Sequence, residues 1–143
     1  MAVYFKVGPI YYEIGAGSFL YSFFSTVAHN LENRKWGNRF PYLMKKLFND
    51  GKLPNKKIDK LEAEVKKIRE ELKEFSPDKV VWDFENLTRR PPWGNEIADT
   101  ITDLSNYFVT SDGEDFFEVF FKALDDAKEI NMDIELDELS FKK

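Results

Sequence analysis

The chain has 143 residues, of which 43% are hydrophobic and 33% charged, a composition typical of a globular protein and not of a disordered one. It contains no cysteine, which excludes disulfides, thiolate metal sites and a cysteine nucleophile. Residues 94–143 hold 14 Asp and Glu against 4 Lys and Arg, a net charge of −10, whereas residues 1–93 carry +5; an acidic surface of this kind repels nucleic acid and anionic membranes.

The start of the chain predicts two strands followed by a helix. Residues 3–7 and 10–14 each alternate apolar with polar side chains, and Gly8-Pro9 separates the two runs. Ser18 follows a glycine-rich turn and is expected to cap a helix over residues 18–32. Because this helix is mostly apolar and aromatic, we expect it to lie centrally in the core.

The middle of the chain predicts two more helices. The first spans residues 40–49 and ends at Asp50-Gly51, a helix C-terminal signal. The second spans residues 55–75 and ends at Ser76-Pro77. Its apolar residues are spaced three or four apart, which places them on one stripe of an amphipathic helix. These residues are Ile58, Leu61, Val65, Ile68 and Leu72.

The second half predicts three strands and one helix. Residues 80–84 and 107–109 are rich in β-branched and aromatic side chains, which favour strands. Residues 111–114 have capping-box spacing and should begin a helix that ends at Asn131. Residues 132–137 alternate apolar and acidic side chains, which predicts a strand with one wholly acidic face.

This order of elements predicts one α+β domain over residues 1–143, with helices packed on a mainly antiparallel sheet. No apolar stretch approaches the roughly 20 residues that a membrane span needs, and the N-terminus lacks a signal-peptide pattern. The sequence therefore predicts a cytoplasmic protein with neither a membrane nor a nucleic acid as its partner.

Few residues suggest catalysis. His29 is the one histidine, so neither a metal site nor a catalytic triad is favoured, and we expect no cofactor. Asp83 and Glu85 are two apart on a predicted strand, near Trp82 and Trp93, and would project from the same face. Glycosidases use such a carboxylate pair at a separation of about 5 Å or about 6.5–9.5 Å. A small hydrolase using this pair is the alternative to a binding protein.

The acidic segment supplies the candidate binding residues. One group falls at the start of the last predicted helix and another on the last predicted strand, and Trp93 lies on a proline-rich loop. Acidic surfaces accelerate association with basic partners, and exposed tryptophan is enriched at binding hot spots. Trp93 could equally pack on the core as the lid of its loop. The candidate residues are Trp93, Asp112, Glu114, Asp115, Glu118, Asp133, Glu135 and Asp137.

Several segments resemble, in order, the immunity protein 70 family of bacterial polymorphic toxin systems. The resemblance is carried by residues 80–87, by Pro91-Pro92-Trp93-Gly94 and by residues 102–113. Residues 6–15 are also similar, as are Trp36-Gly37 and Phe40-Pro41. The similarity runs from the N-terminus to about Ala127.

The resemblance implies a protein without enzymatic activity. Immunity proteins of this kind are encoded beside a toxin, which is often delivered by contact-dependent or secreted systems. They bind the toxin domain in the cytoplasm and neutralise it. For this chain, the resemblance implies a cognate toxin C-terminal domain as partner, and the acidic surface would suit a cationic one such as a nuclease. The sequence does not indicate an oligomeric state.

Overall fold

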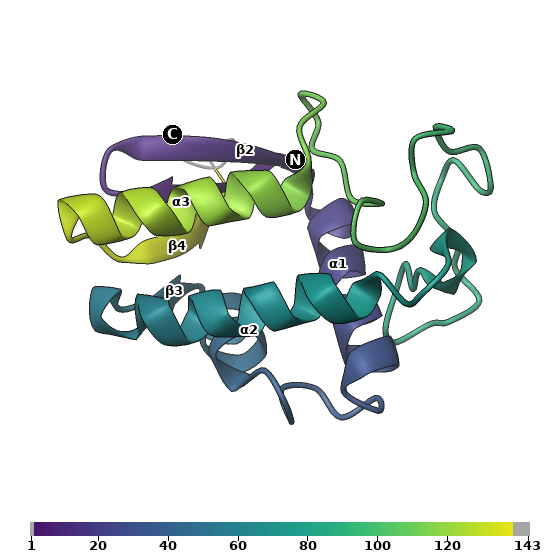
Figure 1. The fold of residues 1–143 in the computed structure, drawn as a ribbon, viewed down its shortest axis with the longest axis horizontal. Coiled ribbons are helices and arrows are strands. Elements are labelled where there is room, and N and C mark those ends of the chain that lie inside the picture. Colours follow the sequence, from purple (N-terminus) through teal and green to yellow (C-terminus); the bar gives the residue numbers. More distant parts are fainter. Residues whose placement is uncertain (1, 139–143) are drawn as a thin grey trace.

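A computed structural model describes residues 2–138, which form a four-stranded sheet with helices on one face (Figure 1). The sheet order is β2-β1-β4-β3, and every pair of neighbouring strands is antiparallel. The strands are β1 (Ala2–Val7), β2 (Ile10–Ala16), β3 (Lys52–Leu53) and β4 (Ile134–Asp137). The predicted α+β class, with helices on an antiparallel sheet, is confirmed.

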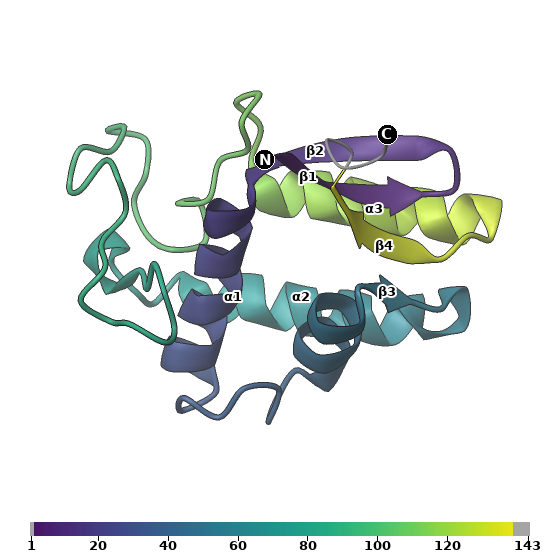
Figure 2. The same cartoon turned by 180° about the vertical axis from the view of Figure 1, so that it is seen from behind.

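The helices form a layer on the sheet. They are α1 (Gly17–Leu31), the π-helix η1 (Tyr42–Asn49), α2 (Ile58–Leu72) and α3 (Phe116–Ile130), with 3-10 turns η2 (Asn55–Lys57) and η3 (Pro77–Lys79). α2 and α3 lie in front of the sheet in Figure 1 and behind it in Figure 2. They run antiparallel, because Lys128 binds Glu62 at 2.8 Å near one end while Arg69 binds Glu118 at 2.9 Å near the other.

Aromatic side chains fill the space between the sheet and the helices. Alternate residues of β1 are buried, and one of them, Phe5, places its ring 4.4 Å from that of Phe120 on α3. The ring of Phe23 on α1 lies 4.6 Å from that of Phe116. Close ring pairs of this kind add to the stabilisation that burial itself provides. Much of the aromatic content of the chain is therefore used in the core.

The strongly periodic segments form the predicted elements, with shifted ends. The helix predicted over residues 55–75 begins with the turn η2 and ends at Leu72, and the helix predicted over residues 40–49 is the π-helix η1. Ser18 does not cap α1, because the N-cap position is Ala16 and no side chain bonds there. Asn131 ends α3 in the left-handed conformation with φ of +57°, as the sequence indicated.

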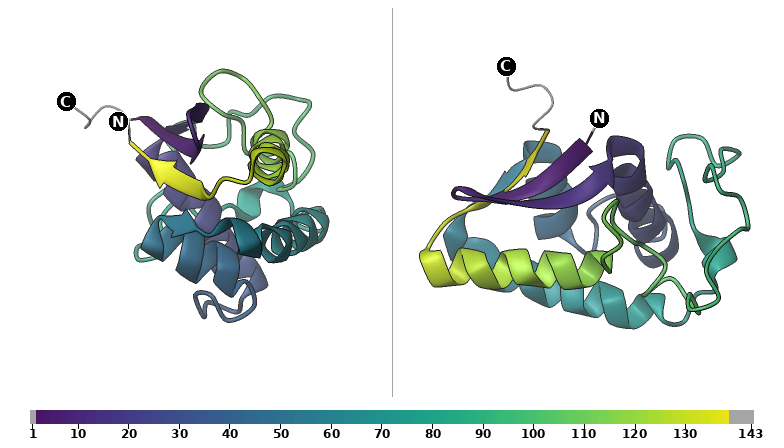
Figure 3. Two further views of the ribbon diagram at one scale, coloured as in Figure 1. Left: turned by 90° about the vertical axis from the view of Figure 1, so that its left-hand side faces the viewer. Right: turned by 90° about the horizontal axis from the view of Figure 1, so that it is seen from above.

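A long irregular segment separates η3 from α3. Within residues 80–115 the one strand-type pairing is a single bridge between Val109 and Asp115, so the strands predicted over residues 80–84 and 107–109 are wrong. Figure 3 shows the first part of this segment beyond α1, whereas near its end the Ser111 N–H reaches the sheet and donates to the Ile14 carbonyl of β2 at 3.0 Å. Residues 80–82 are nonetheless buried, which explains why their composition resembled that of a strand.

Candidate partner-binding surface

At the start of α3, two of the predicted acidic residues form a charge cluster with a basic residue of the same protein. Asp115 is the N-cap, and its carboxylate accepts a hydrogen bond from the Glu118 N–H at 3.0 Å. Arg69 of α2 contacts both acids, at 3.6 Å from Asp115 and 2.9 Å from Glu118. Burial raises the pKa of Asp115, while the Glu118 N–H and Arg69 oppose that change. Asp115 therefore serves the fold, and Glu118 keeps a side chain that is 64% exposed.

The turn before α3 presents two further acids to solvent. Thr110 organises the turn, because its hydroxyl donates to Asp112 at 2.6 Å and accepts from the Glu114 N–H at 3.0 Å. Gly113 supplies the positive φ of +85° that the turn requires. Both acids are exposed, and the Glu114 carboxylate has no partner among residues 2–138. The capping box predicted over residues 111–114 is thus a tight turn, and the true cap, Asp115, follows it directly, four residues after Ser111.

These acids continue into an open groove along α3. The groove has a volume of about 630 Å³ and runs between α3 and Tyr12 of β2. Its charged lining residues are Glu114, Glu118, Lys122, Asp125 and Asp126. Four carboxylates against one ammonium give the groove a negative field, which favours a cationic partner.

Asp126 is fixed within the groove by two neighbours. It accepts a hydrogen bond from the Tyr12 hydroxyl and lies 3.3 Å from the Lys122 ammonium. The Tyr12 hydrogen bond is the main cause of the lowered pKa of Asp126. The Asp126 carboxyl is therefore ionised at neutral pH. Burial, together with the Asp126 charge, raises the pKa of Tyr12. Asp125 differs, because its side chain is 66% exposed and its one ion pair within residues 2–138, with Lys128, is long at 3.9 Å.

Trp93 lies beside this acidic region and is partly packed. Its indole N–H donates to the Tyr107 hydroxyl at 2.8 Å, and its ring meets Trp82 edge-on at 5.4 Å, while 37% of the residue stays exposed. It lines a small pocket that also touches Val109, the residue bridged to Asp115. Trp93 is thus both a packed loop residue and part of the surface next to the start of α3.

The three predicted acids near β4 lie elsewhere. Asp133 caps the turn η2, accepting from the Asn55 N–H at 2.7 Å, and lies 3.6 Å from Lys52. Glu135 stands opposite Lys6 in the sheet register and pairs with it at 3.7 Å. Asp137 stands on the same face as Glu135, away from the helices. The structure therefore brings together five of the eight predicted residues and leaves two on β4 and Asp133 just before it.

A row of polar side chains on α1 positions the irregular segment, and sequence reasoning missed it. The Thr26 hydroxyl accepts from the Val81 N–H at 3.0 Å, and the Ser22 hydroxyl donates to the Val81 carbonyl at 2.9 Å. Ser25 accepts from the Phe84 N–H at 3.0 Å. Ser22, Ser25 and Thr26 follow helical spacing on an otherwise apolar helix, and buried polar groups need partners. This spacing is the feature of the sequence from which the contact between α1 and another segment could have been predicted.

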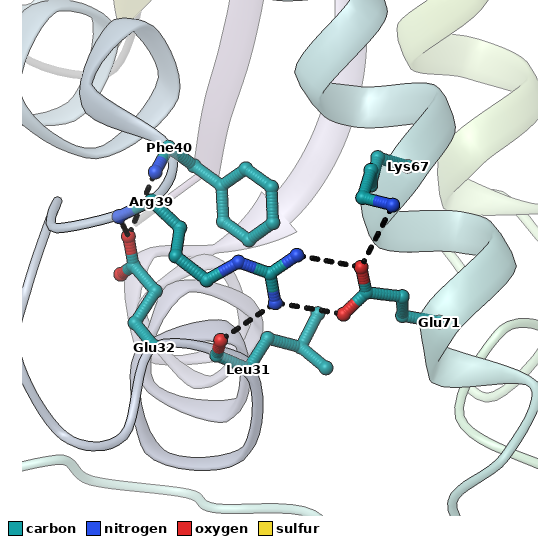
Figure 4. Close-up of polar contacts among 6 residues, drawn as sticks. All are labelled: Leu31, Glu32, Arg39, Phe40, Lys67 and Glu71. Atoms are coloured by element: carbon teal, nitrogen blue, oxygen red, sulfur yellow. Dashed lines mark hydrogen bonds and ion pairs between the residues drawn. The ribbon is translucent and has the colours of Figure 1, made fainter.

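A second unpredicted cluster joins the loop after α1 to α2 (Figure 4). Glu32 is 1% exposed, and its carboxylate accepts from the backbone N–H groups of Gly37 at 2.9 Å and of Arg39 and Phe40 at 3.0 Å. The Arg39 guanidinium makes paired bonds to Glu71 at 2.8 and 2.6 Å. Each acceptor is matched to donors, which is the arrangement of a structural clasp.

Asp83 and Glu85 lie in an irregular turn and not on the predicted strand. The Tyr21 hydroxyl donates to the Glu85 carboxylate at 3.4 Å, and burial together with the charges of Glu85 and Asp83 raises the pKa of Tyr21. One Asp83 oxygen accepts from the Glu85 N–H at 2.9 Å, and the other lies 3.1 Å from Arg89. Asp83 therefore stabilises a local turn.

Within residues 2–138, no helix has the length and apolar character needed to cross a bilayer, and no three potential metal ligands gather in one place.

Comparison with known protein families matches residues 5–136 to the family described as Immunity protein 70. No curated protein and no solved structure gives a significant match. The family match spans the sheet, the helices and all but one of the eight candidate residues, Asp137 being the exception.

Proposed function

Because the chain belongs to the immunity protein 70 family, we propose that it binds and neutralises a cognate antibacterial toxin domain through the acidic groove along α3. Family membership supports the immunity role, and the charge of the groove supports a cationic partner. The partner in this proposal is the C-terminal domain of a toxin, met in the cytoplasm, with neither nucleic acid nor membrane as a ligand. A basic nuclease has the required chemistry.

The mechanism has a steering step and an occluding step. Glu114, Glu118 and Asp125 project free or largely exposed carboxylates, so they attract Lys and Arg of the toxin before contact. Once bound, the acidic surface occupies the site where the toxin would bind its own anionic substrate. The observation that carries this proposal is the gathering of four carboxylates in one groove on a family member whose role is immunity.

The acids near β4 have a smaller part in this proposal. Asp133 and Glu135 are already offset by Lys52 and Lys6, and Asp137 stands on the sheet face away from the helices. They add to the long-range negative field but do not line the groove. Interactions between exposed charges fall off beyond roughly 8 Å at physiological ionic strength. We therefore assign direct contact to the acids at the start of α3.

The test is co-expression of this protein with the toxin domain encoded beside it, scoring growth rescue, co-purification and association rate. A variant carrying Glu114→Gln, Glu118→Gln and Asp125→Asn, three residues that line the groove, should associate about tenfold more slowly at low salt than the wild type. The two rates should converge as salt is raised. Dissociation should change little, because steering acts before contact.

A control with the same net charge separates the groove from overall charge. Asp50→Asn, Glu74→Gln and Glu138→Gln also change the formal charge from −5 to −2, at exposed positions outside the groove. This control should associate within about twofold of the wild type, since its charges lie away from the contact. Equal slowing in both triple variants would refute a role for the groove, and failure of the wild type to rescue growth or form a complex would refute the immunity role with this toxin.

A further inference from the structure

A small apolar pocket lies beside the acidic groove, between the first turn of α1 and the irregular segment. It has a volume of about 230 Å³, and its one charged lining residue is Glu96. Its apolar wall is formed by Phe19, Trp93, Ile97, Ile101, Tyr107 and Val109. Trp93 and Val109 remain 37% and 42% exposed, which is high for large apolar residues.

The wall of the pocket is held in place from behind. The Trp93 indole N–H is satisfied by the Tyr107 hydroxyl at 2.8 Å, and Trp93 also rests edge-on against Trp82. Phe19 meets the buried rings of Phe108 and Phe116 edge-on at 5.9 and 6.3 Å. The indole donor is therefore already used, while the Tyr107 hydroxyl that accepts it keeps its own proton. A preformed apolar cavity is suited to an apolar group and costs little ordering on binding.

The rim of the pocket is acidic. Glu96 is exposed and makes no side-chain hydrogen bond or ion pair within residues 2–138. Val109, on the opposite chain segment, leads within a few residues into the exposed acids Asp112 and Glu114. An apolar centre surrounded by charge is the usual anatomy of a binding hot spot.

We propose that this pocket receives one aliphatic or aromatic side chain from the toxin, presented on a segment that also carries Lys or Arg. The apolar wall selects the inserted side chain, and Glu96, Asp112 and Glu114 select the basic flanks. Trp93 then acts as a wall that accepts an anchor, and does not itself insert into the partner. This inference rests on the proposed immunity function and adds to it the chemistry of the contact.

The pocket can be filled without disturbing the core. Ala98 lines the pocket and is exposed, so Ala98→Trp places a ring in the cavity while leaving the buried side chains unchanged. We expect the dissociation constant for the toxin domain to rise about 10- to 100-fold, chiefly through faster dissociation, since the anchor no longer enters. Thr100→Trp is the matched control, because Thr100 is exposed in the same loop but does not line the pocket, and its affinity should stay within about threefold.

A second variant tests the pocket from another position, in case Ala98→Trp changes the conformation of its own loop. Val109→Asn puts a polar side chain into the wall at an exposed position and should weaken binding about tenfold by the same route. Urea unfolding of each variant checks that the fold is intact.

The outcomes separate the two proposals. If the wild type binds and protects while Ala98→Trp and Val109→Asn bind as tightly as Thr100→Trp, the pocket is not an anchor site and the immunity function stands. If the wild type neither binds nor protects, the function with this toxin fails and the anchor fails with it. Selective loss of affinity in the two pocket variants supports the inference.

Discussion

Replacing Glu32 by glutamine should destabilise the fold by about 2–3 kcal/mol. Glu32 is almost fully buried, and its two carboxylate oxygens accept three backbone N–H groups, from Gly37, Arg39 and Phe40. Figure 4 shows the bonds from Arg39 and Phe40. Glutamine has a single acceptor oxygen. If that oxygen keeps the bonds to Arg39 and Phe40, the glutamine NH2 group must face the Gly37 N–H, so two donors point at each other.

The magnitude follows from these three bonds. A buried N–H left without an acceptor costs about 1–3 kcal/mol. The two bonds that remain change from a charged to a neutral acceptor, which weakens each by about half. Relief of the cost of burying a carboxylate works in the opposite direction, and this keeps the expected total near the middle of the range.

Urea unfolding followed by circular dichroism measures this loss. With a slope of roughly 2 kcal/mol per molar urea, the midpoint should fall by about 1 M. Glu74→Gln is the matched control, because Glu74 is exposed and its side chain makes no hydrogen bond or ion pair within residues 2–138, so its free energy of unfolding should change by less than about 0.5 kcal/mol. A loss below about 1 kcal/mol for Glu32→Gln would show that the three hydrogen bonds do not hold the loop as described.

Three further changes test other parts of the fold. Thr26→Val keeps the side-chain volume but leaves the buried Val81 N–H without its acceptor, so chemical denaturation should show a loss of about 1–3 kcal/mol. Glu71→Gln should lower the free energy of unfolding by about 0.5–1 kcal/mol at pH 7, because Arg39 lowers the folded-state pKa of this partly exposed carboxyl. This stabilisation is present above the unfolded-state pKa of about 4.3 and is lost as the pH falls through the folded-state pKa. Unfolding curves of the variant and the wild type should therefore converge in acid. Gly51→Ala should lower stability by about 1 kcal/mol in a thermal melt, since φ is +78° there although a Cβ would meet no neighbour within 4 Å.

Local periodicity predicted those parts of the fold that local patterns specify. The alternation in β1 and β4 and the stripe of α2 appear in the structure because each pattern matches one buried face. β2 forms as a strand, but its burial does not alternate, and Ile10 is exposed. β3 has two residues, which is too short for a pattern to develop. The strand prediction for residues 80–84 was wrong because buried side chains there do not come with strand pairing. The core buries the side chains, but the backbone groups bond to hydroxyls of α1 and not to a neighbouring strand.

The candidate site was predictable in composition and not in arrangement. The charge count located the acidic segment, but the roles of its members depend on residues far away in the sequence. Arg69 on α2 engages Asp115 and Glu118, and Lys6 on β1 engages Glu135. Such partners are set by tertiary packing, so no spacing rule within the segment could separate structural carboxylates from free ones.

The hydrogen bonds that attach the irregular segment to α1 reach its main chain, apart from the one that the Tyr21 hydroxyl donates to the Glu85 carboxylate at 3.4 Å. The side chains of Ser22, Ser25, Thr26 and Asn30 bond to backbone groups of Lys79, Val81 and Phe84. These bonds make no demand on the identity of the side chains they hold in place. Substitutions along the outer surface of this segment can therefore change the side chains that it presents to a partner without breaking its hydrogen bonds to α1. One scaffold can in this way carry many binding specificities.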